Sequence, residues 1–339
     1  MIRIAYLADG YLPLKTLVSL AKACEESKYE YFFLNEGNTK DAFSTLSALG
    51  TNTKTIGLGT GIAIIYSRTP TMIAMSAATV DEATKKRLIL GLGVGRGARS
   101  STGFNGSIEN MYGVPFKMPL ASMRDYINII RQLLKGNSVN YQGEAYSLER
   151  FKFDFPSVRT DIPIYMAAQG PKMVALAGEI ANGILFASVS PSYIAEVMPS
   201  LIHGAKIGER DYKNIDLGCN ILTAPAWSQE ATYRVWKAIV QRCSMSHYQK
   251  MFQQLGFSKE IKLISQLVNA GDMQKAIEST PKELVESVSL IGDPKLWAER
   301  LEDYKKVGIR LPVIRPMTNL MESLRLIKET PYIFKGFDY

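Results

Sequence analysis

Short apolar segments alternate with amphipathic segments along almost the whole chain, and this alternation limits the possible folds more than any other feature. Eight apolar runs have the length of strands, near residues 5, 32, 59, 90, 164, 185, 218 and 312. Stretches with apolar residues at helical spacing lie between most of them, for example residues 120–134. Strands that are buried on both faces and joined through helices pair in parallel. The pattern therefore predicts an α/β fold with a parallel sheet.

Two parallel architectures are compatible with this order, a (β/α)8 TIM barrel and a doubly wound open sheet. Eight strand–helix units fit the barrel, which typically needs about 250 residues, so that the 339 residues here leave room for insertions. Dinucleotide-binding open sheets carry a Gly-x-Gly-x-x-Gly turn after the first strand. The nearest run, Gly91 to Arg96, follows the fourth strand and ends in Arg instead of Gly. We therefore predict a single TIM-barrel domain over residues 1–339.

Two segments are too long for ordinary connections in such a barrel. Residues 96–119 are rich in Gly, Ser and Asn, and long loops of this kind are usually functional. Residues 229–287 have a mostly helical pattern and stand before the last strand–helix unit. We expect a long loop insertion and a helical insertion at these places.

Composition excludes several classes of protein. No stretch reaches the roughly 18 apolar residues of a membrane span, and the first residues read as a strand, not as a signal peptide. The net charge of +8 is spread along the chain, without a motif typical of nucleic-acid binding. We expect a cytoplasmic protein with no membrane or nucleic-acid partner, and a basic surface that favours small anionic ligands.

Metal sites and a Ser-His-Asp triad are poorly supported. The three cysteines, Cys24, Cys219 and Cys243, form no Cys-x-x-Cys pair, and metal sites draw mostly on clusters of Cys and His. The only histidines, His203 and His247, both lie in helical patterns. We predict no metal site.

In a TIM barrel the active site lies at the carboxyl ends of the strands. The residues there include few acids or bases and many small side chains, which allow a flat ligand to approach the backbone closely. A site of this composition indicates that a cofactor carries the chemistry. The predicted strand ends bring together Asp9, Asn35, Glu36, Gly61, Ile62, Gly93, Ala167, Ala168, Gln169, Gly170, Ala187, Ser188, Asn220 and Arg315.

The sequence Gly170-Pro171-Lys172 joins a predicted strand to a predicted helix, and it has two readings. Pro is favoured in the first turn of a helix, so the pair can be purely structural. Free N–H groups at a helix start also bind anions, and Lys172 adds a positive charge. Both readings remain open at this point.

Four stretches carry a family resemblance: residues 56–70, which end in Arg68-Thr-Pro70, residues 87–95, residues 122–148 and, most closely, residues 163–186. In them the chain resembles the bacterial-luciferase-like superfamily of flavin- and deazaflavin-dependent oxidoreductases. Within that superfamily it is most similar to the methylenetetrahydromethanopterin reductases, which use coenzyme F420. Weaker similarity continues over residues 288–309.

The resemblance implies a TIM barrel with the ring of coenzyme F420, or alternatively of flavin mononucleotide (FMN), lying across the strand ends. It also implies a non-prolyl cis peptide bond at Gly61–Ile62, with Ile62 supporting one face of the ring. The rim and the resemblance together predict the cofactor-binding residues Asn35, Gly61, Ile62, Gly93, Ala168, Gln169, Gly170, Lys172 and Ser188.

One difference from these reductases concerns the exit of the second strand. They carry an Asp-His pair there, whereas Asn35 and Glu36 occupy the matching positions, and Tyr6 stands where an acidic residue is expected. The acid–base candidates in this sequence are instead Asp9, Glu36 and Tyr66.

These observations predict an F420-dependent oxidoreductase that transfers a hydride to or from a small substrate, for example a cyclic or iminium-like acceptor. An FMN-dependent monooxygenase and a flavin-binding relative without turnover remain as alternatives. We expect a homodimer or a larger homo-oligomer.

Overall fold

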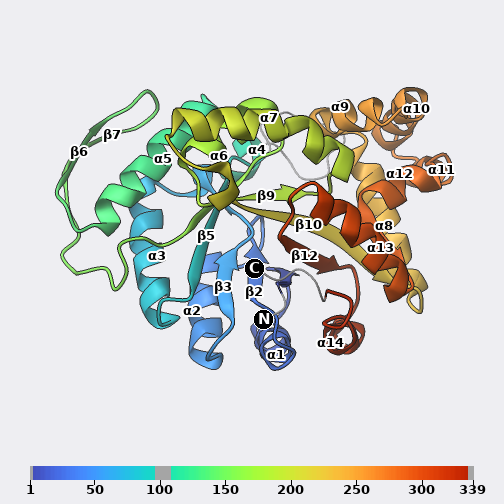
Figure 1. The fold of residues 1–339 in the computed structure, drawn as a ribbon, viewed down its shortest axis with the longest axis horizontal. Coiled ribbons are helices and arrows are strands. Elements are labelled where there is room, and N and C mark those ends of the chain that lie inside the picture. The colour runs from blue at the N-terminus through green and yellow to red at the C-terminus, as the bar shows by residue number, and fades with distance from the viewer. Residues whose placement is uncertain (1–2, 96–107, 335–339) are drawn as a thin grey trace.

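The computed structural model describes residues 3–95 and 108–334, and within them eight parallel strands close a barrel (Figure 1). Each strand pairs with the next along the ring, and β12 pairs with β1 to close it. This arrangement confirms the predicted TIM barrel, and all eight predicted strand positions are occupied. In order around the ring the strands are β1 (Ala5–Asp9), β2 (Tyr31–Asn35), β3 (Gly57–Thr60), β5 (Leu88–Gly93), β8 (Ile164–Ala167), β9 (Gly183–Ala187), β10 (Asp216–Pro225) and β12 (Leu311–Pro316).

Helices cover the outside of the barrel because each has one apolar stripe. In α1, for example, Leu17, Leu20, Ala21 and Cys24 are buried at helical spacing. The outer helices are α1 (Leu14–Glu26), α2 (Ala42–Asn52), α3 (Pro70–Ala83), α5 (Pro119–Leu134), α6 (Pro171–Ile180), α7 (Pro191–Ile207), α8 (Gln229–Arg242), α13 (Pro294–Lys306) and α14 (Leu320–Glu329).

The barrel interior is packed with side chains because alternate strand residues point inward. Gly91 is required here by close approach, since an added Cβ would lie 2.0 Å from the carbonyl oxygen of Thr60. The inward cluster consists of Ala5, Leu7, Phe33, Ile89, Tyr165, Leu185, Leu311 and Val313.

An ion network fills the amino end of the barrel. Arg3 Nε lies 2.8 Å from Glu30 Oε2, and Arg3 Nη2 lies 2.7 Å from Asp216 Oδ2. The Tyr165 hydroxyl donates to the same Asp216 oxygen at 2.7 Å. The network lies at the opposite end from the strand exits, so we assign it to stability.

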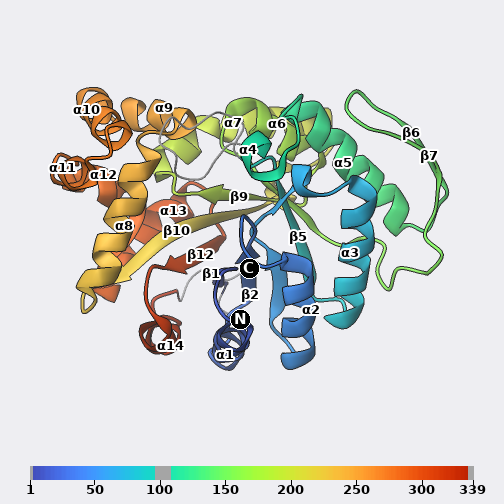
Figure 2. The same cartoon turned by 180° about the vertical axis from the view of Figure 1, so that it is seen from behind.

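The segments outside the regular pattern lie at two ends of the molecule (Figures 1 and 2). A hairpin of β6 (Val139–Gln142) and β7 (Ser147–Phe151) projects beyond α3 and α5. The predicted helical insertion, residues 229–287, holds α8 and then α9 (Ser246–Gln254), α10 (Ser258–Asn269), α11 (Met273–Glu278) and α12 (Lys282–Ser287).

Several short elements were not predicted from the sequence, among them β11 (Ser289–Gly292), β4 (Ala63–Ile64) and α4 (Ile108–Tyr112). Strand β11 pairs with the outer part of β10, and β4 pairs with β5. Helix α4 lies within the predicted long loop 96–119, whose residues 96–107 are outside the described residues. Each of these elements has five residues or fewer, too few to show a periodicity.

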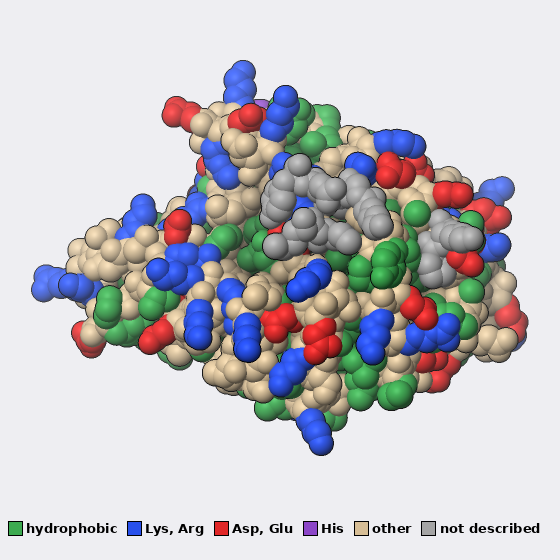
Figure 3. All heavy atoms as spheres, turned by 60° about the horizontal axis from the view of Figure 1, so that its bottom comes forward, with side chains coloured by type: hydrophobic (Ala, Val, Ile, Leu, Met, Phe, Trp, Pro, Cys, Tyr) green, Lys and Arg blue, Asp and Glu red, His purple; other side chains and the backbone are tan. Residues whose placement is uncertain are grey.

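Two surface properties bear on possible partners. Among the described residues, no helix combines the length and the apolar character that crossing a membrane requires. On the face drawn in Figure 3, Lys and Arg side chains are intermingled with Asp and Glu. The positive net charge is therefore not gathered into a single basic patch on this face.

Candidate active site

The carboxyl ends of the barrel strands form a mouth with two chemically different halves. Inward residues alternate with outward ones, so the last inward position of each strand follows from the interior cluster. On β3, β5, β8 and β9, which are neighbours, these positions are Gly61, Gly93, Ala167 and Ala187. On β12, β1 and β2, also neighbours, they are Arg315, Asp9 and Asn35. On β10 the matching residue is Asn220, which pairs with Ala187 of β9, and β10 continues beyond it to Pro225. Small residues thus line one half of the mouth, which we call the small half, and polar side chains line the other, which we call the polar half.

Ile62 lies over the small half. An added Cβ on Gly93 would come within 2.7 Å of Ile62 Cδ1 and 3.2 Å of Ala167 Cβ, so Gly93 leaves the room that Ile62 occupies. Ile62 is half-buried and packs against the interior cluster. The peptide bond Gly61–Ile62 is cis, which confirms the prediction for this bond.

Charged and amide groups join across the polar half. Arg315 Nη2 lies 2.6 Å from Asp9 Oδ1, and the Asn35 side-chain amide donates to the same oxygen at 3.3 Å. Asp9, a predicted acid–base candidate, is thus engaged in an ion pair. The sequence places Arg315 at a strand end, but the prediction gave it no role in the site.

Glu36, the second acid–base candidate, is engaged by its own neighbours. Its Oε2 accepts a hydrogen bond from the Ile64 N–H at 3.0 Å, and its Oε1 lies 2.6 Å from Arg68 Nη1. Its backbone N–H donates to the carbonyl of Ile62 at 3.3 Å. Glu36 therefore binds the chain that leaves β3.

Tyr66, the third candidate, is half-buried beside the chain that precedes α5. Its hydroxyl donates to the carbonyl of Lys117 at 2.6 Å, and its ring centroid lies 5.2 Å from that of Phe116. Burial raises the pKa of Tyr66 above its ordinary value of 10.0, so the phenol is protonated at neutral pH.

The predicted cofactor residues after β8 are held in place by β9 and α7. Ala168 is buried, and the Gln169 amide donates to the carbonyl of Ala187 at 2.7 Å. The Tyr193 hydroxyl donates to the carbonyl of Gln169 at 3.1 Å. This loop leads directly into Gly170.

Gly170 is the residue that precedes the first turn of α6, and it is exposed, as is Lys172. Its φ of −73° is accessible to any residue, so the backbone does not require glycine here. A Cβ added at Gly170 would meet no atom of the described residues within 4 Å. The structure thus leaves open space at the predicted anion site.

Three buried polar atoms, which lie just after β9, within β10 and near the end of β12, have no hydrogen-bond partner among the described residues: Ser188 Oγ, Asn220 Oδ1 and Arg315 Nε. Ser188 is fully buried, with a left-handed φ of +49°. Its backbone N–H donates to the Asn220 carbonyl at 2.8 Å. Buried polar groups usually have partners, and groups without one are common at functional sites.

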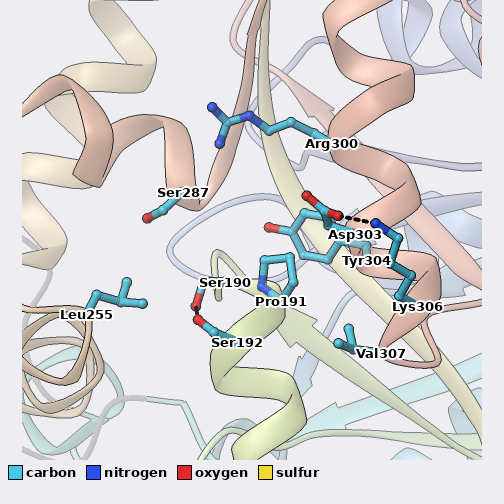
Figure 4. A pocket seen from close by; sticks show the side chains of 10 residues that line it. All are labelled: Ser190, Pro191, Ser192, Leu255, Ser287, Arg300, Asp303, Tyr304, Lys306 and Val307. Carbon is cyan, nitrogen blue, oxygen red and sulfur yellow. Dashed lines mark hydrogen bonds and ion pairs between the residues drawn. The ribbon is translucent and has the colours of Figure 1, made fainter.

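A cavity of about 410 Å³ lies beyond the end of β9, between α7 and α13 (Figure 4). Ser190 and Ser192 line it from the start of α7, where Ser190 caps the helix, whereas Arg300, Asp303 and Tyr304 line it from α13. The Tyr304 hydroxyl donates to the carbonyl of Val189 at 2.8 Å, and this bond ties α13 to the strand exit. The cavity thus places hydroxyl and charged groups just beyond the end of β9.

No metal centre is formed by the described residues, which contain no group of three or more His, Cys, Asp or Glu side chains placed to hold an ion. The three cysteines are buried and free.

Comparisons with known proteins agree with this architecture. The 5,10-methylenetetrahydromethanopterin reductase of Methanopyrus kandleri is 27% identical over 315 residues, which cover 88% of each chain. The F420-dependent glucose-6-phosphate dehydrogenase of Gordonia bronchialis is 28% identical over 216 residues, which cover 60% of this chain and 62% of that protein.

A solved structure, that of the coenzyme F420-dependent tetrahydromethanopterin reductase from Methanopyrus kandleri, has the same fold. It is 24% identical, with a TM-score of 0.81 over 97% of this chain and 98% of that one. A family model described as luciferase-like monooxygenase matches residues 3–311, which is most of the chain. The chain therefore belongs to the luciferase-like monooxygenase family.

Proposed function

We propose that this protein is a coenzyme F420-dependent oxidoreductase that transfers a hydride to or from a small substrate. The observation that carries the proposal is the division of the barrel mouth into a small half under Ile62 and a polar half around Asp9 and Arg315. The small residues leave room for Ile62, against whose apolar side chain a planar ring fits, and the polar half remains to orient a substrate.

The residues present are suited to a deazaflavin. Gly93 and Ala167 add little bulk beneath Ile62, which presents an apolar surface to one face of a ring. When bound, the deazaflavin would supply a carbon centre that gives or accepts the hydride. Open space at Gly170 would accommodate its phosphodiester, with Lys172 close by in sequence.

The two carboxylates at the mouth suit a substrate that needs little acid–base assistance. Asp9 is paired with Arg315, and Glu36 is paired with Arg68. Both carboxylates already bind an arginine of the protein, so neither is a free group that a substrate could use for proton transfer. We infer that the substrate is of the iminium-like type, whose carbon accepts a hydride without a simultaneous proton transfer.

The names of the relatives support the proposed coenzyme more strongly than they support any particular substrate. One relative reduces methylenetetrahydromethanopterin, and another is an F420-dependent glucose-6-phosphate dehydrogenase. These substrates differ, whereas a coenzyme F420 link recurs in the names of the dehydrogenase and of the solved reductase. The family description also names monooxygenases, so an FMN-dependent monooxygenase is the second candidate.

A turnover assay separates these functions. Reduced F420 is mixed with the protein and a panel of cyclic imines, iminium salts and ketones, and its reoxidation is followed by absorbance without oxygen. We expect protein-dependent reoxidation with the iminium class. Turnover only with reduced FMN and oxygen would support the monooxygenase, and binding without turnover would support a non-catalytic relative.

A further inference from the structure

We propose that Arg68 is a positioning residue, which holds the chain between β3 and α3 so that Ile62 stays over Gly93 at the barrel mouth. The sequence marks this residue only as part of an Arg-x-Pro ending, and the site described above names it only as the ion-pair partner of Glu36. Its expected effect on coenzyme affinity rests on the proposed function, whereas its effect on the chain does not.

Arg68 connects three elements around the exit of β3. Its guanidinium lies 2.6 Å from Glu36 Oε1 and also pairs with Asp41, the residue that caps the start of α2. Its carbonyl oxygen accepts a hydrogen bond from the Tyr126 hydroxyl of α5 at 2.7 Å. The guanidinium also lies over the ring of Phe43, 5.1 Å from its centroid. One side chain thus ties the β2 exit and α2 to the segment after β3.

Glu36 passes this constraint to the residues around Ile62. While one carboxylate oxygen pairs with Arg68, the other accepts from the Ile64 N–H at 3.0 Å. The Glu36 backbone N–H donates to the Ile62 carbonyl at 3.3 Å, so the same residue binds the segment at two points. The Glu36 side chain is only 5% exposed, and its orientation therefore depends on the cation that faces it.

The geometry requires arginine and not merely a positive charge. A guanidinium carries several N–H donors in a rigid fork and can bind two carboxylates at once, as it does here with Glu36 and Asp41. A lysine would keep the charge but would replace the fork with a single ammonium group. The Arg68→Lys variant therefore separates positioning from charge.

The experiment compares Arg68→Lys and Glu36→Gln with a matched control, Arg124→Lys. Arg124 donates through both of its terminal nitrogens to the carboxylate of Glu179. This ion pair joins α5 to α6 in the outer helical layer. Thermal unfolding first establishes that each variant is folded. Hydrogen exchange of the Ile64 amide is then measured without coenzyme, and coenzyme F420 is titrated by fluorescence.

We expect Arg68→Lys to accelerate hydrogen exchange of the Ile64 amide and to weaken F420 binding about tenfold. A loss of affinity of this size is typical when one charge-assisted hydrogen bond is lost. The absorption band of the bound coenzyme should also shift, because its surroundings change. Glu36→Gln keeps an acceptor for the Ile64 N–H and should lie between Arg68→Lys and wild type. Arg124→Lys should leave the exchange rate, the affinity and the band unchanged.

Two results would overturn the inference: wild-type exchange at Ile64 in a folded Arg68→Lys protein, or faster exchange with unchanged F420 affinity and spectrum. If the wild-type protein itself does not bind F420, the proposed function fails. In that case the exchange measurement alone decides whether Arg68 positions the segment.

Discussion

Arg315 on the last barrel strand donates a hydrogen bond to Asp9 on the first, with 2.6 Å between Nη2 and Oδ1, although 306 positions separate them in sequence. The pair spans the seam where β12 meets β1 and closes the ring. Asn35 on β2 donates to the same carboxylate oxygen, so three neighbouring strands share one polar cluster. We take this cluster as the part of the mouth that orients the substrate.

Replacing Asp9 tests that assignment. In Asp9→Asn the ion pair is lost but the shape is kept, and Arg315 is freed to turn toward the mouth. We expect a stability change of about 1–2 kcal/mol and a fall in kcat of at least about tenfold. Steady-state kinetics with the best imine of the panel and reduced F420 provide the measurement. An unchanged kcat in the folded variant would show that the pair serves only to close the barrel.

Gly93 tests the small half of the mouth. A Cβ at position 93 would lie 2.7 Å from Ile62 Cδ1 and 2.8 Å from Ile62 Cγ1, so Gly93→Ala should displace Ile62 and cost about 1–3 kcal/mol. Adding Ile62→Ala removes both clashing atoms. The double variant should recover stability but not F420 affinity, because the apolar support is then missing. Recovery of full affinity in the double variant would contradict a supporting role for Ile62.

Gly170 offers the opposite case, a glycine with open space around it. Because an added Cβ meets no atom of the described residues within 4 Å and φ is −73°, Gly170→Ala and Gly170→Val should leave the unfolding midpoint unchanged. If a phosphate binds at the start of α6, affinity for F420 should fall in the order Gly, Ala, Val. Equal affinities across the three, by calorimetric titration, would return the Gly-Pro pair to a structural role.

The ion network at the amino end of the barrel predicts a pH dependence of stability. Burial alone would raise the pKa of Asp216, but the hydrogen bond and charge of Arg3 outweigh it and hold the pKa below its ordinary 3.8. The stabilisation is therefore complete above the unfolded-state pKa and is lost as the pH falls through the lower, folded-state value.

Asp216→Asn should thus destabilise the protein by roughly 1–3 kcal/mol at pH 7, and the gap from wild type should narrow below about pH 4. Urea unfolding at a series of pH values measures it. Glu329→Gln, which removes an exposed partner of Arg325, serves as the control and should change stability by no more than about 0.5 kcal/mol. A gap between Asp216→Asn and wild type that stays constant down to pH 3 would argue against this role for Asp216.

The sequence was most informative where structure depends on local pattern. The eight barrel strands follow from apolar runs between amphipathic helices, and the cis bond at Gly61–Ile62 followed from family resemblance. The hydrogen-bond and ion-pair partners of the side chains could not be predicted from the sequence. Glu36 meets Arg68 across 32 positions and Asp9 meets Arg315 across 306, and no local periodicity encodes such pairings.

Part of the polar half could have been predicted by asking which alternate residues of each strand point into the barrel. Arg315 and Asn220 occupy the same inward register as buried Val313 and Gly218, two residues earlier on their strands. A charged or amide side chain at the carboxyl end of such a row is a candidate ligand contact. The Oγ of Ser188, in contrast, lacks a hydrogen-bond partner among the described residues because of three-dimensional packing, and no sequence pattern indicates this.

A comparative titration of the purified protein with coenzyme F420 and with FMN, under identical conditions, tests the assignment to F420 most directly. We expect F420 to bind more tightly than FMN. It further predicts that this preference is reduced in Gly170→Val and in Gly93→Ala, whereas Arg124→Lys retains it. Equal affinities, or tighter binding of FMN, would contradict the assignment of this protein as an F420-dependent oxidoreductase.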